Sequence, residues 1–189
     1  LMLRYRAVEQ RKGMIGTIDR ELTKTDRNGK AAGRMSAIAN WAADTKNGLT
    51  RPFMERVAGI DRNAELPKFH GQTFMKQAKE SPATVDTTAP AKARKAVLFA
   101  TCFANYNSPE IGVAAKEILA RNGVETEVVY PGCCGMPQLE QGDLSAVAES
   151  AKTVSEELGT WIDRGYDVIA LIPSCALMLK FEWPLILPN

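Results

Sequence analysis

Residues 130–137 read Tyr-Pro-Gly-Cys-Cys-Gly-Met-Pro, with the adjacent cysteines Cys133 and Cys134 between two glycines. The stretch directly follows an apolar run that is typical of a buried strand. The chain has 4 cysteines, and the other two, Cys102 and Cys175, also follow apolar runs. Every cysteine therefore lies just past a predicted strand.

Strands are predicted over residues 95–101, 124–130 and 167–172, and helical patterns fill the intervals between them. This alternation predicts right-handed crossovers and a parallel sheet, whose simplest strand order is 2-1-3. The carboxyl ends of parallel strands meet at one edge, where open α/β sheets bind ligands. We therefore expect an α/β fold, a small parallel three-stranded sheet with flanking helices, with all four thiols at one edge.

The composition divides the chain into three parts. Residues 1–80 show short helical apolar stripes, including a predicted helix over 31–44, and form an extended, mostly helical connecting segment with no sufficient core of its own. Residues 81–95 are rich in Pro, Ala and Thr and are predicted as a linker. Residues 96–189 carry the alternating strands and helices of the α/β domain.

The net charge of +2 hides an asymmetry. Residues 1–95 carry 19 Lys and Arg against 10 Asp and Glu, whereas residues 96–189 carry 5 against 12. A basic first half suits an acidic partner, anionic lipid head groups, the acidic second half, or simply a solvated face. Its basic residues are scattered without interleaved aromatics, so no nucleic acid is expected as a partner.

The surroundings of the chain are expected to be reducing. No apolar run approaches the ~20 residues of a membrane-spanning helix, and no secretory signal is visible. We expect a cytoplasmic protein, with peripheral binding at the inner membrane face as one role for the basic half. Residue 1 already lies in a helical pattern and residues 188–189 directly follow an apolar stretch, so a piece of a longer protein is expected.

The four cysteines are candidate metal ligands. Thiolates bind iron–sulfur clusters and many zinc ions, and four of them complete either kind of site. Gly132 and Gly135 would let the backbone approach a bulky group and adopt unusual dihedral angles. Two other readings stay open: buried cysteines that act as small apolar side chains, and a strained disulfide between Cys133 and Cys134.

The remaining notable residues are predicted to have structural rather than functional roles. His70, the only histidine, is predicted as a loop or packing residue, and residues 105–107 (Asn-Tyr-Asn) as a polar turn. The apolar residues Phe181, Trp183 and Leu185 are predicted as core. No acid–base pair for substrate chemistry is visible, so catalysis is expected in a partner subunit.

The cysteine pattern resembles a known family. The order Cys102, then residues 133–135 (Cys-Cys-Gly), then Cys175 is similar to the cysteine-rich CCG domain of iron–sulfur oxidoreductases. This domain is found in heterodisulfide reductase, in subunits for lactate and glycolate oxidation, and in anaerobic glycerol-3-phosphate dehydrogenase, whose CCG-bearing subunit is the type that this chain resembles most. Residues 100–107 and 173–184 resemble parts of the first CCG repeat, and the likeness continues upstream at 1–6, 51–54 and 66–67.

The resemblance implies an electron-transfer subunit that passes electrons from a flavin dehydrogenase partner toward quinone or another carrier. It implies an iron–sulfur cofactor, most typically of the 4Fe-4S type, held by the four cysteines; zinc is the alternative. Such proteins carry a ferredoxin module and two CCG repeats, so residues 96–189 would be the first repeat, truncated or whole. One position departs from the pattern: the family's fifth cysteine would fall at Ile172.

Overall fold

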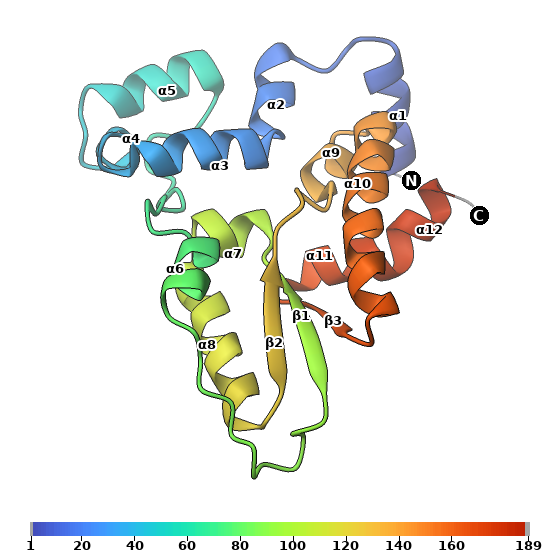
Figure 1. Ribbon diagram of the computed structural model, residues 1–189. Coiled ribbons are helices and arrows are strands. Elements are labelled where there is room, and N and C mark those ends of the chain that lie inside the picture. Colours follow the sequence, from blue (N-terminus) through green and yellow to red (C-terminus); the bar gives the residue numbers. More distant parts are fainter. Residues whose placement is uncertain (1, 188–189) are drawn as a thin grey trace.

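The computed structural model describes residues 2–187 and is built around a three-stranded sheet (Figure 1). Its strands are β1 (Lys95–Phe99), β2 (Glu125–Val129) and β3 (Asp167–Ala170). Both strand pairs are parallel and the order is β2-β1-β3. The predicted α/β fold and the predicted strand order are therefore confirmed.

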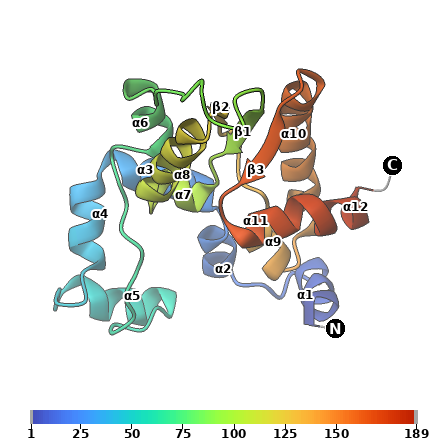
Figure 2. The same ribbon diagram turned by 90° about the horizontal axis from the view of Figure 1, so that it is seen from below.

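Helices cover both faces of this sheet (Figures 1 and 2). One face packs against α6 and α8, and the other against α10 and the helices after β3. The helices of this part are α6 (Phe74–Glu80), α7 (Cys102–Tyr106), α8 (Pro109–Arg121), α9 (Met136–Glu140), α10 (Leu144–Asp163), α11 (Pro173–Leu177), a π-helical turn (Met178–Glu182) and α12 (Trp183–Ile186).

The central strand, β1, contributes side chains to a hydrophobic core on each face of the sheet. Side chains alternate along a strand, so Val97 and Phe99 face α10, whereas Leu98 faces α6 and α8. All three are fully buried. Full burial of such a side chain stabilises the fold by about 1.5–3 kcal/mol. Phe74 of α6 is also fully buried and packs with Leu98 in the smaller core, between the sheet and α6 and α8.

Five helices precede this unit: α1 (Met2–Arg11), α2 (Thr17–Leu22), α3 (Thr25–Arg34), α4 (Ser36–Ala43) and α5 (Thr50–Ala58). Figure 1 shows α2–α5 lying beyond the carboxyl ends of the strands. Helix α3 packs on α7, where a Cβ on Gly29 would come within 2.4 Å of Tyr106 Cδ2. Only glycine permits this approach. The predicted, mostly helical segment before the sheet is confirmed.

The boundaries inside this segment differ from the prediction. The helix expected over residues 31–44 is broken at Met35, whose φ and ψ are −119° and 40°. The break separates α3, which packs on α7, from α4, which packs on α5. Tertiary packing thus overrides a continuous local pattern.

The segment 81–95 is bound to the α/β unit by backbone hydrogen bonds. The amide of Asp86 donates to the Ala120 carbonyl at 2.9 Å, and that of Ala91 donates to the Asn122 carbonyl at 3.2 Å. The division into 1–80, 81–95 and 96–189 remains a prediction. Residues 1, 188 and 189, on which the expectation of a longer protein rests, lie outside the described residues.

Among residues 2–187, none of the helices combines the length and the apolar character needed to cross a bilayer.

Candidate functional site

The four cysteines lie at the carboxyl edge of the sheet. Cys102 begins α7, just after β1, and Cys175 lies in the first turn of α11, which follows β3. Cys133 and Cys134 lie in the loop between β2 and α9. Parallel pairing brings these three connections to the same end, as the sequence predicted.

The sulfurs form two close pairs. The Sγ atoms of Cys102 and Cys133 are 3.8 Å apart, and those of Cys134 and Cys175 are 3.1 Å apart. All four cysteines are free, so the adjacent Cys133 and Cys134 form no disulfide. Three are buried and Cys102 is partly exposed. Each pair joins cysteines that follow different strands.

The four thiols are the right kind of ligand for an iron–sulfur cluster or a zinc ion, but their sulfurs are not arranged as a complete ligand set. Within residues 2–187, no group of three or more His, Cys, Asp or Glu side chains is arranged to hold a metal ion. Four free thiols at one edge match, in kind, the ligands of an iron–sulfur cluster or a zinc ion. Thiol side chains commonly reach their final positions only as the metal binds. The ligand roles of the four cysteines remain a prediction.

Hydrogen bonding between the thiols shifts their pKa values in opposite directions within each pair. The contact with Cys133, and then burial, raises the pKa of Cys102, while the Cys102 thiol lowers the pKa of Cys133. Contacts with Cys133 and Cys175 raise the pKa of Cys134, and the Cys134 thiol lowers the pKa of Cys175. Within each pair, the pKa of one thiol is therefore lowered, which favours its thiolate form. A thiolate is the form that binds metals.

The two glycines of the cysteine loop differ in backbone conformation and in the space around them. Gly135 has a φ of 87°, in the left-handed region, and directly precedes α9. A Cβ there would lie 3.4 Å from Val147. Gly132 does not have a positive φ, and its Cβ would meet only Val154 Cγ2 at 3.9 Å. The expected unusual backbone is therefore found at Gly135 and not at Gly132.

A residue of the helical segment touches the cysteines directly. The Thr25 hydroxyl, at the start of α3, lies 3.5 Å from Cys102 Sγ and 3.5 Å from Cys133 Sγ. Thr25 is 77 positions from Cys102 in the sequence. The sequence prediction missed it, because no local pattern marks one threonine in a polar, basic segment.

The next residue, Asp26, binds two tyrosines beside the sulfurs. Its Oδ1 atom accepts hydrogen bonds from the hydroxyls of Tyr130 at 2.7 Å and Tyr106 at 3.3 Å. The two rings meet edge to face, with centroids 5.7 Å apart. Burial and the Asp26 charge raise the pKa of Tyr106 to about 12. Burial, the charge of Cys102 and the hydrogen bond to Asp26 raise the pKa of Tyr130.

Two structural readings from the sequence are wrong. Residues 105–107 are not a polar turn: Asn105 and Tyr106 are buried in α7, and Asn105 Oδ1 accepts from the Met75 amide at 3.0 Å. Phe181 and Leu185 are exposed, at 53% and 78%, rather than in the core. The π-helical turn changes the angular spacing of these residues relative to an ordinary helix.

Two other expectations, those for Trp183 and His70, hold. Trp183 is buried, and its Nε1 donates to the Cys134 carbonyl at 3.0 Å, which fixes the cysteine loop. His70 lies between α5 and α6, where its backbone amide donates to the Tyr106 carbonyl. Ile172, at the position of the family's fifth cysteine, precedes α11 and packs against the core that includes Cys175.

Comparison with known proteins identifies the unit that carries these cysteines. Residues 96–180 match the family described as "Cysteine-rich domain" (CCG). The matched region is named the CCG domain after this family. The resemblance inferred from the sequence is thus confirmed, and the four cysteines all fall within the CCG domain.

Similarity to named proteins extends beyond the CCG domain. The chain is 28% identical over 168 residues to a subunit of anaerobic glycerol-3-phosphate dehydrogenase of Escherichia coli, covering 88% of this chain and 41% of that protein. It is 23% identical over 132 residues to a subunit of fumarate reductase (CoM/CoB) of Methanothermobacter marburgensis, covering 69% and 26%.

A third relative, lactate utilization protein A of Bacillus thuringiensis, is 34% identical over 93 residues, which cover 48% of this chain and 36% of that protein. The chain thus spans less than half the length of these curated relatives. No solved structure gives a significant match.

Proposed function

We propose that this chain is an iron–sulfur electron-transfer subunit of an anaerobic dehydrogenase or heterodisulfide-reductase-like complex. The observation that carries the proposal is the gathering of four free thiols, from three separate strand connections, at the carboxyl edge of the CCG domain. Similarity to proteins named as subunits of a dehydrogenase and of a reductase supports a redox role.

In this proposal Cys102, Cys133, Cys134 and Cys175 hold the cluster, of the 4Fe-4S type. When bound, the cluster supplies a one-electron carrier. Three of the four thiols are buried, which shields their sulfurs from water. Cys102 and Cys175 lie in the first turns of α7 and α11, where the positive end of a helix dipole favours a negatively charged group. The Cys134 carbonyl stays fixed by Trp183, so this part of the loop keeps its shape.

Substrate chemistry would take place in a partner subunit, for which a flavin dehydrogenase is the leading candidate, and electrons would pass on to quinone or another carrier. Large apolar side chains on α4 and α5 are well exposed, including Ile38 at 63%, Trp41 at 59% and Phe53 at 66%. Exposed apolar groups in a basic segment suit contact with a partner subunit or peripheral contact with the inner face of the membrane. This role would place the chain in the cytoplasm.

Anaerobic purification followed by visible absorption spectroscopy and by iron, sulfide and zinc analysis tests the proposal. An iron–sulfur protein is expected to show a broad visible band that bleaches with dithionite, together with iron and sulfide in similar amounts. The alternative is a structural zinc or docking module, because four sulfurs are also a complete zinc ligand set. Zinc without a visible band would support that alternative and refute the redox role.

A further inference from the structure

We propose that Thr25 is a positioning residue that sets the reduction potential of the cysteine site. Its hydroxyl lies 3.5 Å from the sulfurs of Cys102 and Cys133, which belong to different strand connections. A single side chain from the helical segment therefore bridges one thiol pair. The inference rests on the proposed function, because a reduction potential exists only if a redox group binds.

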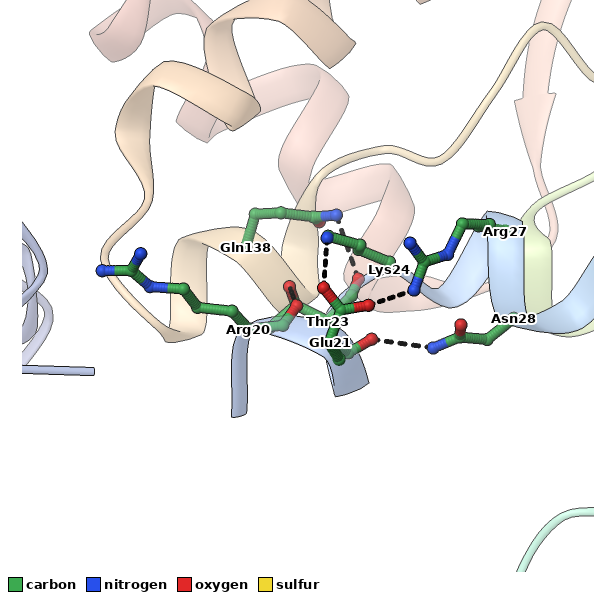
Figure 3. Close-up of polar contacts among 7 residues, drawn as sticks. All are labelled: Arg20, Glu21, Thr23, Lys24, Arg27, Asn28 and Gln138. Carbon is green, nitrogen blue, oxygen red and sulfur yellow. Dashed lines mark hydrogen bonds and ion pairs between the residues drawn. The ribbon is translucent and has the colours of Figure 1, made fainter. Parts of the chain in front are cut away.

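The polypeptide holds Thr25 in place from both sides. In the preceding turn, Gln138 Nε2 of α9 donates to the Thr23 carbonyl at 3.0 Å, and Asn28 Nδ2 donates to the Glu21 carbonyl at 2.8 Å (Figure 3). After Thr25, the Asp26 carboxylate accepts the two tyrosine hydroxyls. The contact between the hydroxyl and the sulfurs is thus supported by α9, α3 and the tyrosines, rather than by one flexible side chain.

The charged neighbours of Thr25 are engaged elsewhere. Lys24 and Arg27 both form ion pairs with Glu21, as Figure 3 shows. All three of these side chains are substantially exposed, so solvent screens their charges. Thr25 therefore offers the sulfurs a neutral hydroxyl with one hydrogen to donate.

Donation of that hydrogen affects the two redox states unequally. Hydrogen bonds to ligand sulfurs are among the features that set the potential of an iron–sulfur cluster. The reduced state carries one more negative charge, so its sulfurs accept the bond more strongly. The Thr25 hydroxyl should stabilise the reduced state and raise the potential. Because it has only one hydrogen, it donates to Cys102 or Cys133 at any moment.

The test measures the midpoint potential of the anaerobically reconstituted full chain in a redox titration followed by electron paramagnetic resonance. Thr25→Val replaces the hydroxyl by a methyl group of similar size, Thr25→Ser retains the hydroxyl, and Thr25→Ala is the second hydroxyl-free variant should valine prevent loading. Thr23→Val is the matched control, since within residues 2–187 the Thr23 hydroxyl donates only to the Arg20 carbonyl.

We expect a more negative potential in Thr25→Val, or in Thr25→Ala if valine prevents loading, and values close to wild type in Thr25→Ser and Thr23→Val. An unchanged potential in a loaded hydroxyl-free variant, or an equal shift in Thr23→Val, would overturn the inference and leave the proposed function intact. A wild type that binds no iron and sulfide would instead overturn the proposed function, and the inference with it.

Discussion

Tyr130 donates a 2.7 Å hydrogen bond to Asp26, a residue 104 positions earlier in the sequence. The bond joins the end of β2 to the first turn of α3, next to the Thr25 contact with the sulfurs. Tyr106 of α7 donates to the same oxygen. The helical segment and the CCG domain thus meet at the cysteine edge, and one carboxylate binds them together.

Removing this carboxylate should destabilise the protein. Asp26→Ala leaves the partly buried Tyr130 hydroxyl without its acceptor. An unpaired polar group that is fully buried costs about 1–3 kcal/mol, which is the upper bound for this variant. Urea unfolding of the metal-free protein measures the loss. Asp19→Ala is the matched control, because Asp19 also lies in the first turn of a helix but is exposed. Equal losses in the two variants would show that the tyrosine bonds add nothing.

Alkaline pH should weaken the same contact. The folded-state pKa values of Tyr106 and Tyr130 are raised above the unfolded value of about 10, so their stabilising contribution is complete below about pH 10 and is lost as the pH rises. For Tyr106 the loss runs from there to its folded pKa of about 12. Unfolding free energies measured across this range should fall less steeply in Tyr130→Phe than in wild type. Parallel pH profiles would contradict the assignment.

The two glycines of the cysteine loop should respond differently to alanine. Gly135→Ala places a side chain at a φ of 87°, which costs roughly 1–2 kcal/mol, and brings its Cβ against Val147. Gly132→Ala meets only Val154 at 3.9 Å and should change stability much less. Thermal or urea unfolding of both variants compares them directly. A larger loss in Gly132→Ala would contradict the described loop geometry.

Replacing one candidate ligand should remove much of the iron. Cys175 is buried and its sulfur lies 3.1 Å from that of Cys134, so Cys175→Ser removes one of only four thiols at the edge. Iron and sulfide analysis after anaerobic purification measures the result. Ser155→Ala, an exposed hydroxyl site on α10, serves as the control and should keep its iron. Unchanged iron in Cys175→Ser would exclude Cys175 as a ligand.

A fifth thiol at residue 172 should alter the site. Ile172 immediately precedes α11 and packs against the core that contains Cys175. Ile172→Cys should cost about 1 kcal/mol through lost packing. We expect additional iron or a changed electron paramagnetic resonance spectrum, whereas Ile172→Val should retain the wild-type spectrum. Identical spectra in all three proteins would mean that position 172 does not reach the site.

Local patterns in the sequence determined the architecture of the CCG domain. The apolar runs and their intervals predicted the parallel sheet, because side-chain alternation and crossover handedness leave few arrangements. The same patterns placed all four cysteines at one edge, since each follows a strand. The burial of Trp183 and the left-handed backbone of Gly135 could also be predicted from the residue types and their positions in the sequence.

Only the tertiary structure decided how that edge is completed. The pairing of Cys102 with Cys133 and of Cys134 with Cys175 depends on how three loops pack, which no spacing specifies. Thr25 and Asp26 join the site because Gly29 lets α3 approach Tyr106 closely, across a separation where local propensity carries no information. The break at Met35 has the same physical origin: packing between distant segments outweighs the preference of a short stretch of chain.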